Sequence, residues 1–138
     1  MPRRVARRKP GAPPFGAHAG DAFVTRFIDP AGIIDVSLVT SAFRMTKKQL
    51  AETLGLAPAT MSKTSRRKAT RPQTRLREML EILYRVCEMG GGEVQAMAWY
   101  RAQPLPALDG RTPEALTKAG EAAAVCDYLD HLALGGFA

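Results

Sequence analysis

The chain has 138 residues, a length that suits one domain or two small lobes with a shared core. Apolar residues make up 46% of it and aromatic residues only 7%, and the many Ala, Leu and Met residues predict an all-α fold rather than a β-sandwich. No stretch reaches the roughly 20 apolar residues of a membrane span, and no signal peptide follows the charged start, so we expect a cytoplasmic protein without a membrane partner.

The net charge of +7 is distributed unevenly along the chain. Residues 1–10 carry five basic and no acidic groups, and residues 44–77 carry ten basic groups and one acidic group. Residues 78–138, in contrast, carry nine acidic and four basic groups. A dense basic block is typical of a protein that binds a polyanion, although a merely solvated surface would have the same composition.

The first 43 residues contain a polar tail and one clear helix. Residues 1–20 are rich in Arg, Pro, Gly and Ala, and we expect them to form a disordered basic tail. A turn is expected at Asp29–Gly32. Asp35 then suits the cap of a helix that extends to residue 43. Its buried face is expected to carry Val36, Val39 and Phe43.

The stretch "MTKKQLAETLGLAPATMSK" (45–63) predicts two short helices joined by a turn. Thr46 and Gln49 have the spacing of a capping box. Gly55 stands where a residue of positive φ would end the first helix, and Pro58 suits the first position of the second. Because this helix-turn-helix pattern lies in the basic block, we expect a DNA-binding lobe, over residues 21–90.

In a helix-turn-helix, the second helix enters the major groove, and neighbouring cations contact phosphates. The candidate DNA-binding residues are Lys47, Lys48, Ala59, Thr60, Ser62, Lys63, Arg66, Arg67, Lys68 and Arg71. The start of the second helix has no Arg, Asn or Gln to read bases, so modest specificity per half-site and a homodimer are expected.

The remaining sequence predicts further helices. One covers residues 71–89, the glycines at 90–92 end it, and another covers 93–102, with Met97, Ala98 and Trp99 buried. Ile82 and Met89 lie off the main apolar stripe and indicate a second apolar face of the 71–89 helix. This face could form a dimer contact, or the helix could be buried on two sides within one lobe. Thr112 and Pro113 start the next helix, and Gly120 ends it. The last helix is expected to bury Ala122, Val125, Leu129 and Leu132 and to stop at Gly135–Gly136.

No pattern in the sequence indicates an enzyme. The histidines and cysteines do not have the spacing of metal ligands, and "GGG" at 90–92 lacks the Lys and Ser/Thr of a phosphate-binding loop. Cys87 and Cys126 lie in apolar helical patterns and are expected to be buried thiols. His131 follows Asp127 by one helical turn, which favours a surface pair. We therefore expect no catalytic residues, no metal and no cofactor.

The order of these features resembles the Xre/MbcA/ParS-type antitoxins, the partners of RES-domain toxins. The resemblance covers about residues 27–138. It rests on residues 45–63 as an Xre-like helix-turn-helix, and on "AWYRAQPLPALDGRTPEALTKAGEAAAVCDYLDHLALGGFA" (98–138) as the toxin-binding region. The residues of the second stretch that match the family pattern are Trp99, Gly110, Arg111, Thr112, Pro113, Leu116, Gly135, Gly136, Phe137 and Ala138.

The resemblance implies an Xre-like helix-turn-helix lobe followed by a small helical toxin-binding lobe at residues 91–138. It further implies an antitoxin of a type II system that inserts its carboxy-terminal residues into the active site of an NAD-degrading RES toxin. The family also binds operator DNA to repress its own operon, and forms hetero-oligomers with the toxin. Two alternatives remain: a stand-alone transcriptional regulator whose carboxy-terminal lobe only dimerises, and a pure inhibitor with a vestigial helix-turn-helix.

Overall fold

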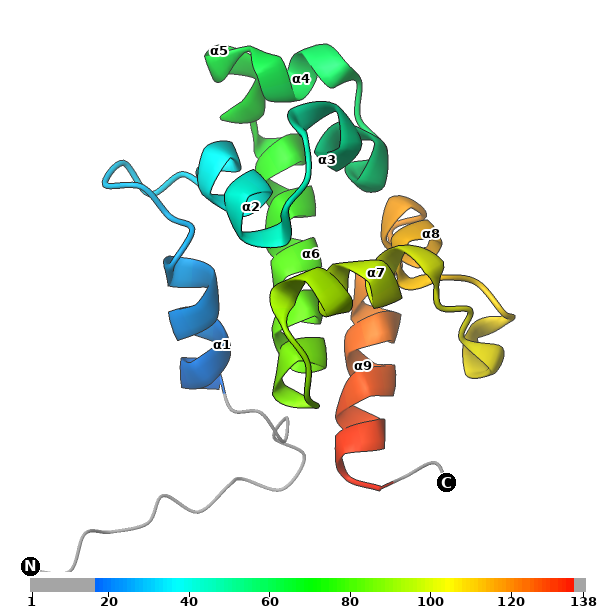
Figure 1. Cartoon of the computed structure of the whole chain (residues 1–138). Coiled ribbons are helices and arrows are strands. Elements are labelled where there is room, and N and C mark those ends of the chain that lie inside the picture. The colour runs from blue at the N-terminus through cyan, green and yellow to red at the C-terminus, as the bar shows by residue number, and fades with distance from the viewer. Residues whose placement is uncertain (1–16, 136–138) are drawn as a thin grey trace, which may run out of the picture.

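The computed structural model describes residues 17–135. Over this range the chain forms nine α-helices and one short 3-10 helix, with no strand beyond two isolated bridges, so the expected all-α fold is confirmed (Figure 1). The elements in chain order are α1 (Ala17–Thr25), α2 (Val36–Phe43), α3 (Lys47–Leu54), α4 (Pro58–Ser62), α5 (Thr64–Arg67), α6 (Thr70–Glu88), α7 (Glu93–Ala102), η1 (Pro106–Leu108), α8 (Pro113–Lys118) and α9 (Ala122–Ala133).

Helix α6 is the centre of the molecule. It is 19 residues long and packs against α1, α7 and α9 along its length, while α3, α4 and α5 gather at its amino-terminal end (Figure 1). Ile82 is fully buried although it lies off the main stripe, so two-sided burial is confirmed for this residue. Met89, in contrast, is 43% exposed. A helix that is apolar on two sides can serve as the core of a small all-α fold.

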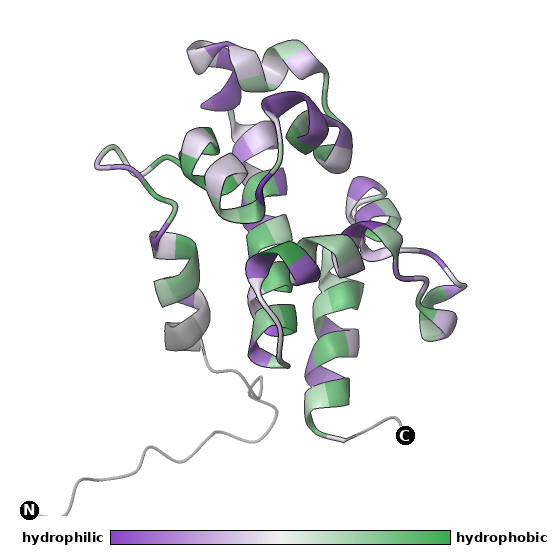
Figure 2. Cartoon of the chain, viewed as in Figure 1, coloured by the Kyte–Doolittle hydropathy of each residue, from purple (hydrophilic) through white to green (hydrophobic). Residues whose placement is uncertain are grey.

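Residues from nearly every helix form one hydrophobic cluster. Every α-helix of the described part except α5 contributes buried residues to it. The expected lobe boundary, between residues 90 and 91, falls in the loop between α6 and α7, and buried residues from both sides belong to this cluster. Figure 2 shows the apolar residues concentrated along α6, α7 and α9, and more polar residues at the end that carries α4 and α5.

The helix at the amino-terminal end was not expected. Helix α1 begins at Ala17, before the expected end of the tail at residue 20, and residues 1–16 lie outside the described residues. Val24 and Phe27 are buried, and the ring of Phe23 lies 5.6 Å from that of Tyr84 on α6. These aromatic contacts hold α1 against the central helix.

The expected turns and caps of the next three helices are confirmed. Gly32 N donates to Asp29 O, which closes the turn, and the Asp35 carboxylate caps α2. Gln49 N donates to Thr46 Oγ1 over 3.0 Å, and Thr46 N donates to Gln49 Oε1 over 2.9 Å, which completes the capping box of α3. Gly55 ends α3 with φ of 69°, a conformation that favours glycine, and Pro58 is the first residue of α4.

The second helix of this pair is shorter than expected. Lys63, which we expected inside it, has φ of −99° and ψ of 123°, so α4 ends at Ser62 and α5 starts at Thr64. Arg67 stabilises the break, because its Nη1 donates to Met61 O over 3.4 Å and its Nη2 donates to Thr64 Oγ1 over 3.3 Å. Met61 itself is fully buried against the core and fixes α4 on α3.

The carboxy-terminal helices also begin at the predicted residues. Thr112 Oγ1 accepts from Ala115 N over 3.1 Å and Pro113 is the first residue of α8, which confirms this helix start. On α7 the predicted burial of Ala98 is wrong, because this residue is exposed. Trp99, which was also expected to be buried, is half-buried. The helical period instead directs Ala96, Met97 and Tyr100 toward the core.

The two cysteines are free thiols and both are half-buried rather than fully buried. Burial raises the pKa of the Cys126 thiol to about 11, and it also raises the pKa of Cys87. Both thiols are therefore protonated at neutral pH. No helix within residues 17–135 is both long and apolar enough to cross a membrane.

Candidate functional site

The basic and acidic parts of the chain differ in whether their Lys and Arg residues form ion pairs. None of the ten Lys and Arg residues of 44–77 takes part in an ion pair within the described residues. In residues 78–138 all four basic residues are paired with carboxylates: Arg85, Arg101, Arg111 and Lys118. Apart from Arg67 and Arg75, which donate to internal oxygen atoms, the unpaired cations are available to an external anion. The pairs of Arg85 and Arg101, in contrast, join neighbouring helices of the carboxy-terminal region.

Most of the predicted DNA-binding residues share one end of the molecule, on α3, α4, α5 and the start of α6 (Figure 1). Ala59 and Thr60 are half-buried on α4, and the Ser62 hydroxyl donates to Pro58 O over 3.2 Å. The exposed cations at this end are Lys47, Lys48, Lys63, Arg66, Lys68 and Arg71. We call these six residues the basic end.

Arg67 differs from the other predicted cations. Its guanidinium is half-buried, and it donates to Met61 O and Thr64 Oγ1. The carbonyl of Arg67 in turn accepts from Gln73 Nε2 over 2.9 Å. Arg67 thus stabilises the junction of α4, α5 and α6, and this internal role occupies donors that sequence reasoning assigned to phosphates.

Arg75 is a structural residue of this region that sequence reasoning missed. Its Nη1 donates to Leu54 O over 2.8 Å, and its Nη2 donates to Lys118 O over 3.3 Å. These carbonyls belong to the last residues of α3 and α8, where a cation also interacts favourably with the negative end of the helix dipole. Arg75 therefore ties the α3–α4 pair to the carboxy-terminal helices.

The predicted toxin-binding motif forms a tight turn between α7 and α8. Leu105 N donates to Arg111 O over 3.0 Å, and Asp109 and Gly110 both have positive φ, of 62° and 69°. Gly110 thus adopts a conformation that favours glycine, and Asp is among the few other residues that tolerate it. The turn presents Ala107 and Leu108 toward α9.

Arg111 fixes the far side of this turn to the start of α9. Its guanidinium donates to both carboxylate oxygens of Glu121, over 3.3 Å for the Nη2–Oε1 bond. The hydrogen bond from Arg111 lowers the pKa of Glu121, and the carboxylate in turn raises the pKa of Arg111. A two-bond pair of this kind restrains orientation as well as distance.

The remaining motif residues serve mainly to shape the domain. Leu116 and Pro113 are buried, Thr112 is an amino-terminal cap, and Trp99 packs half-buried against the core. Gly135 follows the end of α9, and the neighbouring Leu134 is 69% exposed. Gly136, Phe137 and Ala138, which complete the predicted plug, lie outside the described residues.

Sequence reasoning also missed a shallow groove beside the turn. Its volume is 330 Å³, and it lies between the η1 turn and the outer face of α9. The residues that line it are Ala107, Leu108, Ala124, Asp127, Tyr128 and His131. Ala107 and Leu108 are distant in the sequence from the four residues of α9, so only the packing of the turn on α9 brings the two groups together.

Fold and charge together define a small all-α binding protein, with a cationic end and an ion-paired carboxy-terminal region. Residues 79–135 match the family model of the antitoxin Xre/MbcA/ParS C-terminal toxin-binding domain. This match supports the resemblance to the Xre/MbcA/ParS-type antitoxins and an antitoxin role in a toxin–antitoxin system. The match begins inside α6 and includes the turn, the groove and α9. Neither the curated proteins nor the solved structures gave a match to the chain.

Proposed function

We propose that this antitoxin neutralises a RES-domain toxin that degrades NAD, and that it also binds operator DNA to repress its own operon. The observation that carries the proposal is the toxin-binding domain at residues 79–135 in the same chain as a basic end whose cations have no ion pair within the described residues. One region would bind the toxin, and the other would bind DNA.

For the toxin, the contact surface is the groove together with the end of α9. The aromatic ring of Tyr128 and the apolar side chain of Leu108 provide contact area, and the adjacent Asp127 adds a carboxylate. Gly135, Gly136, Phe137 and Ala138 would extend from α9 into the active-site cleft, where Phe137 is the anchor. The acidic carboxy-terminal region suits a toxin surface of opposite charge.

For DNA, α4 would lie in the major groove and α3 would cross the backbone. Thr60 offers a hydroxyl and a methyl group to base edges, while Lys63 follows immediately at the break after α4. Lys47 and Lys48 lie at the start of α3 and would contact the phosphates beside the major groove. With few base-reading side chains, a homodimer on two half-sites would supply the specificity.

The decisive experiment uses the protein encoded next to this one in the genome. The full chain and a chain without the last four residues are each co-expressed with that protein, and cell growth, NAD content and co-purification are measured. We expect the full chain to bind it and preserve NAD, and the shortened chain to bind more weakly and to lose neutralisation. Normal neutralisation by the shortened chain would overturn the plug, and a neighbour that leaves NAD intact would overturn the RES assignment.

The same preparations separate the alternative functions. A salt-dependent shift of the upstream DNA is expected for the proposed antitoxin-repressor. DNA binding without any protein partner would instead favour the stand-alone regulator, and neutralisation without DNA binding would favour the pure inhibitor.

A further inference from the structure

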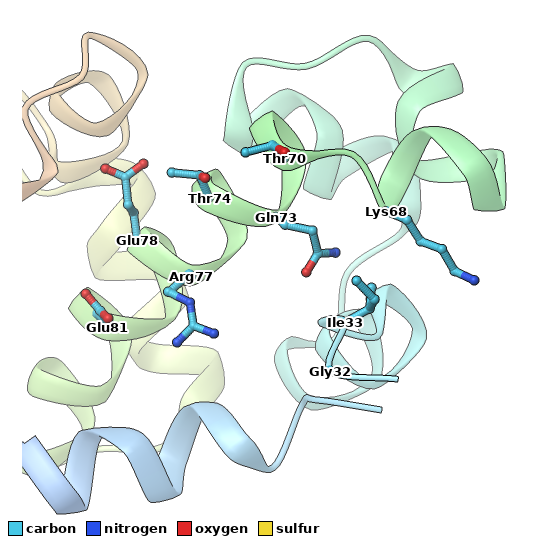
Figure 3. A pocket seen from close by; sticks show the side chains of 9 residues that line it. All are labelled: Gly32, Ile33, Lys68, Thr70, Gln73, Thr74, Arg77, Glu78 and Glu81. Atoms are coloured by element: carbon cyan, nitrogen blue, oxygen red, sulfur yellow. The ribbon is translucent and has the colours of Figure 1, made fainter. Parts of the chain in front are cut away.

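A second groove lies on the side of α6, next to the basic end. It has a volume of 380 Å³ and is formed by the turn before α2 and the amino-terminal half of α6 (Figure 3). The residues that line it are Gly32, Ile33, Lys68, Thr70, Gln73, Thr74, Arg77, Glu78 and Glu81. The antitoxin domain match starts at residue 79, so most of this groove precedes it.

The walls of the groove are held in place by Gln73. Its Oε1 accepts from Ile34 N over 2.8 Å, and its Nε2 donates to Ile34 O over 3.2 Å and to Arg67 O over 2.9 Å. This side chain therefore joins the turn before α2 to the α5–α6 junction. Because its polar atoms are occupied, Gln73 fixes the shape of the groove and leaves the binding of a ligand to the other side chains.

The other polar groups of the groove include two cations and two hydroxyls. Lys68, Thr70, Thr74 and Arg77 are all exposed, and neither cation has an ion pair within the described residues. In Figure 3 Arg77 lies beside Glu78 and Glu81 at one end of the groove, with its guanidinium turned away from their carboxylates, and Lys68 lies at the other end. An anion would therefore be attracted to each of the two cations and repelled by the two carboxylates.

We infer that this groove contacts the backbone of duplex DNA, with Arg77 and Lys68 each neutralising one phosphate and the Thr70 and Thr74 hydroxyls as additional donors. The inference rests on the proposed DNA binding and extends it beyond the α3–α4 pair. Lys68 belongs both to the basic end and to the groove, so the groove adjoins the basic end. An open groove with exposed cations suits the backbone of a long polymer.

Such a contact has a clear physical purpose. Helix α4 offers few side chains that discriminate bases, so affinity must come largely from phosphates. Each phosphate contact steepens the dependence of the binding constant on salt by about 0.9 in a double-logarithmic plot. Arg77 would supply one such contact at a position that carries no base readout.

The test is a salt titration with a fluorescent random-sequence DNA duplex. The wild type, Arg77→Gln and the Arg77→Gln/Lys68→Gln double variant are compared with Arg101→Gln, which removes the same charge from a residue paired with Glu114. Circular dichroism checks the fold of each variant. We expect the salt slope to fall by about 1 for Arg77→Gln and by about 2 for the double variant, with no change for Arg101→Gln.

The outcomes separate this inference from the proposed function. If the wild type binds DNA but all four slopes agree, the groove does not contact DNA while the proposed DNA binding stands. If the wild type does not bind DNA at low salt, both fail. If Arg77→Gln weakens capture of the toxin and leaves the salt slope unchanged, the groove belongs to a protein interface and the inference is overturned.

Discussion

Arg75 Nη1 donates a hydrogen bond to the carbonyl oxygen of Leu54 over 2.8 Å, so the central helix directly holds the last residue of α3. The same guanidinium reaches the last carbonyl of α8, at Lys118. One side chain thus satisfies groups at two helix ends that are far apart in the sequence. This contact adds a polar restraint to the apolar packing that positions the α3–α4 pair.

Replacing Arg75 by Ala is expected to lower the free energy of unfolding by about 2 kcal/mol, because two carbonyls lose a charged donor. Urea denaturation followed by circular dichroism measures the change. Arg77→Ala is the matched control: Arg77 lies on the same helix, is exposed, and should stay within about 0.5 kcal/mol of the wild type. Equal stability of the two variants would show that the Arg75 contacts contribute little.

Gly55→Ala is expected to destabilise the protein by more than the cost of placing alanine at a positive φ. Gly55 has φ of +69°, and a Cβ there would lie 3.0 Å from Lys118 Cγ. Gly32 has a similar φ of +83° but open space around it, so Gly32→Ala isolates the backbone cost of about 1 kcal/mol. In thermal or urea unfolding, the Gly55→Ala variant should be less stable than the Gly32→Ala variant. The reverse order would contradict close packing of α3 on α8.

Lys63→Ala is expected to weaken operator binding without affecting toxin neutralisation. Lys63 is exposed and adopts an extended backbone conformation that Ala also adopts, so the break between α4 and α5 should persist. Electrophoretic mobility shift and growth rescue measure the two activities. Arg26→Ala is the control, because it removes one exposed cation that follows α1, pairs with Glu93 and lies away from the basic end. Equal loss of both activities would show that the two interfaces are not separable.

The Arg111–Glu121 pair predicts a pH-dependent contribution to stability. Arg111 lowers the folded-state pKa of Glu121 below its ordinary value of 4.5. The pair therefore stabilises the fold above pH 4.5, and this contribution disappears as the pH falls through the lower, folded-state pKa. Glu121→Gln should be less stable than the wild type at pH 6, with the difference shrinking at pH 3. A difference that is independent of pH would exclude this linkage.

Local signals explain what the sequence predicted well. The cap of Thr46 by Gln49, the cap formed by Thr112 and the positive φ of Gly55 each depend on residues within one helical turn, so their spacing is visible in the sequence. The apolar stripe of α6 follows the helical period in the same way. The resemblance to the toxin-binding domain rested on turn and cap residues of 98–138, and the family match covers residues 79–135.

Long-range packing explains what the sequence did not show. Arg75 bonds to residues 21 and 43 positions away, and no local pattern marks such a contact. The break at Lys63 depends on Arg67, whose guanidinium turns back onto Met61 rather than toward solvent. The grooves arise only where the turns pack on α6 and α9, and Ala98 was misassigned because the packing of α7 selects a neighbouring face.

The length of α6 has a consequence for the two charged partners. At 1.5 Å per residue, its 19 residues span about 28 Å, and the basic end and the end of α9 lie at opposite ends of this span (Figure 1). The Debye length at physiological salt is about 8 Å, so the two ends are separated by more than three Debye lengths. DNA and toxin bound at these places would form a ternary complex in which neither partner's field reaches the other, and any influence between them must travel through the helices themselves.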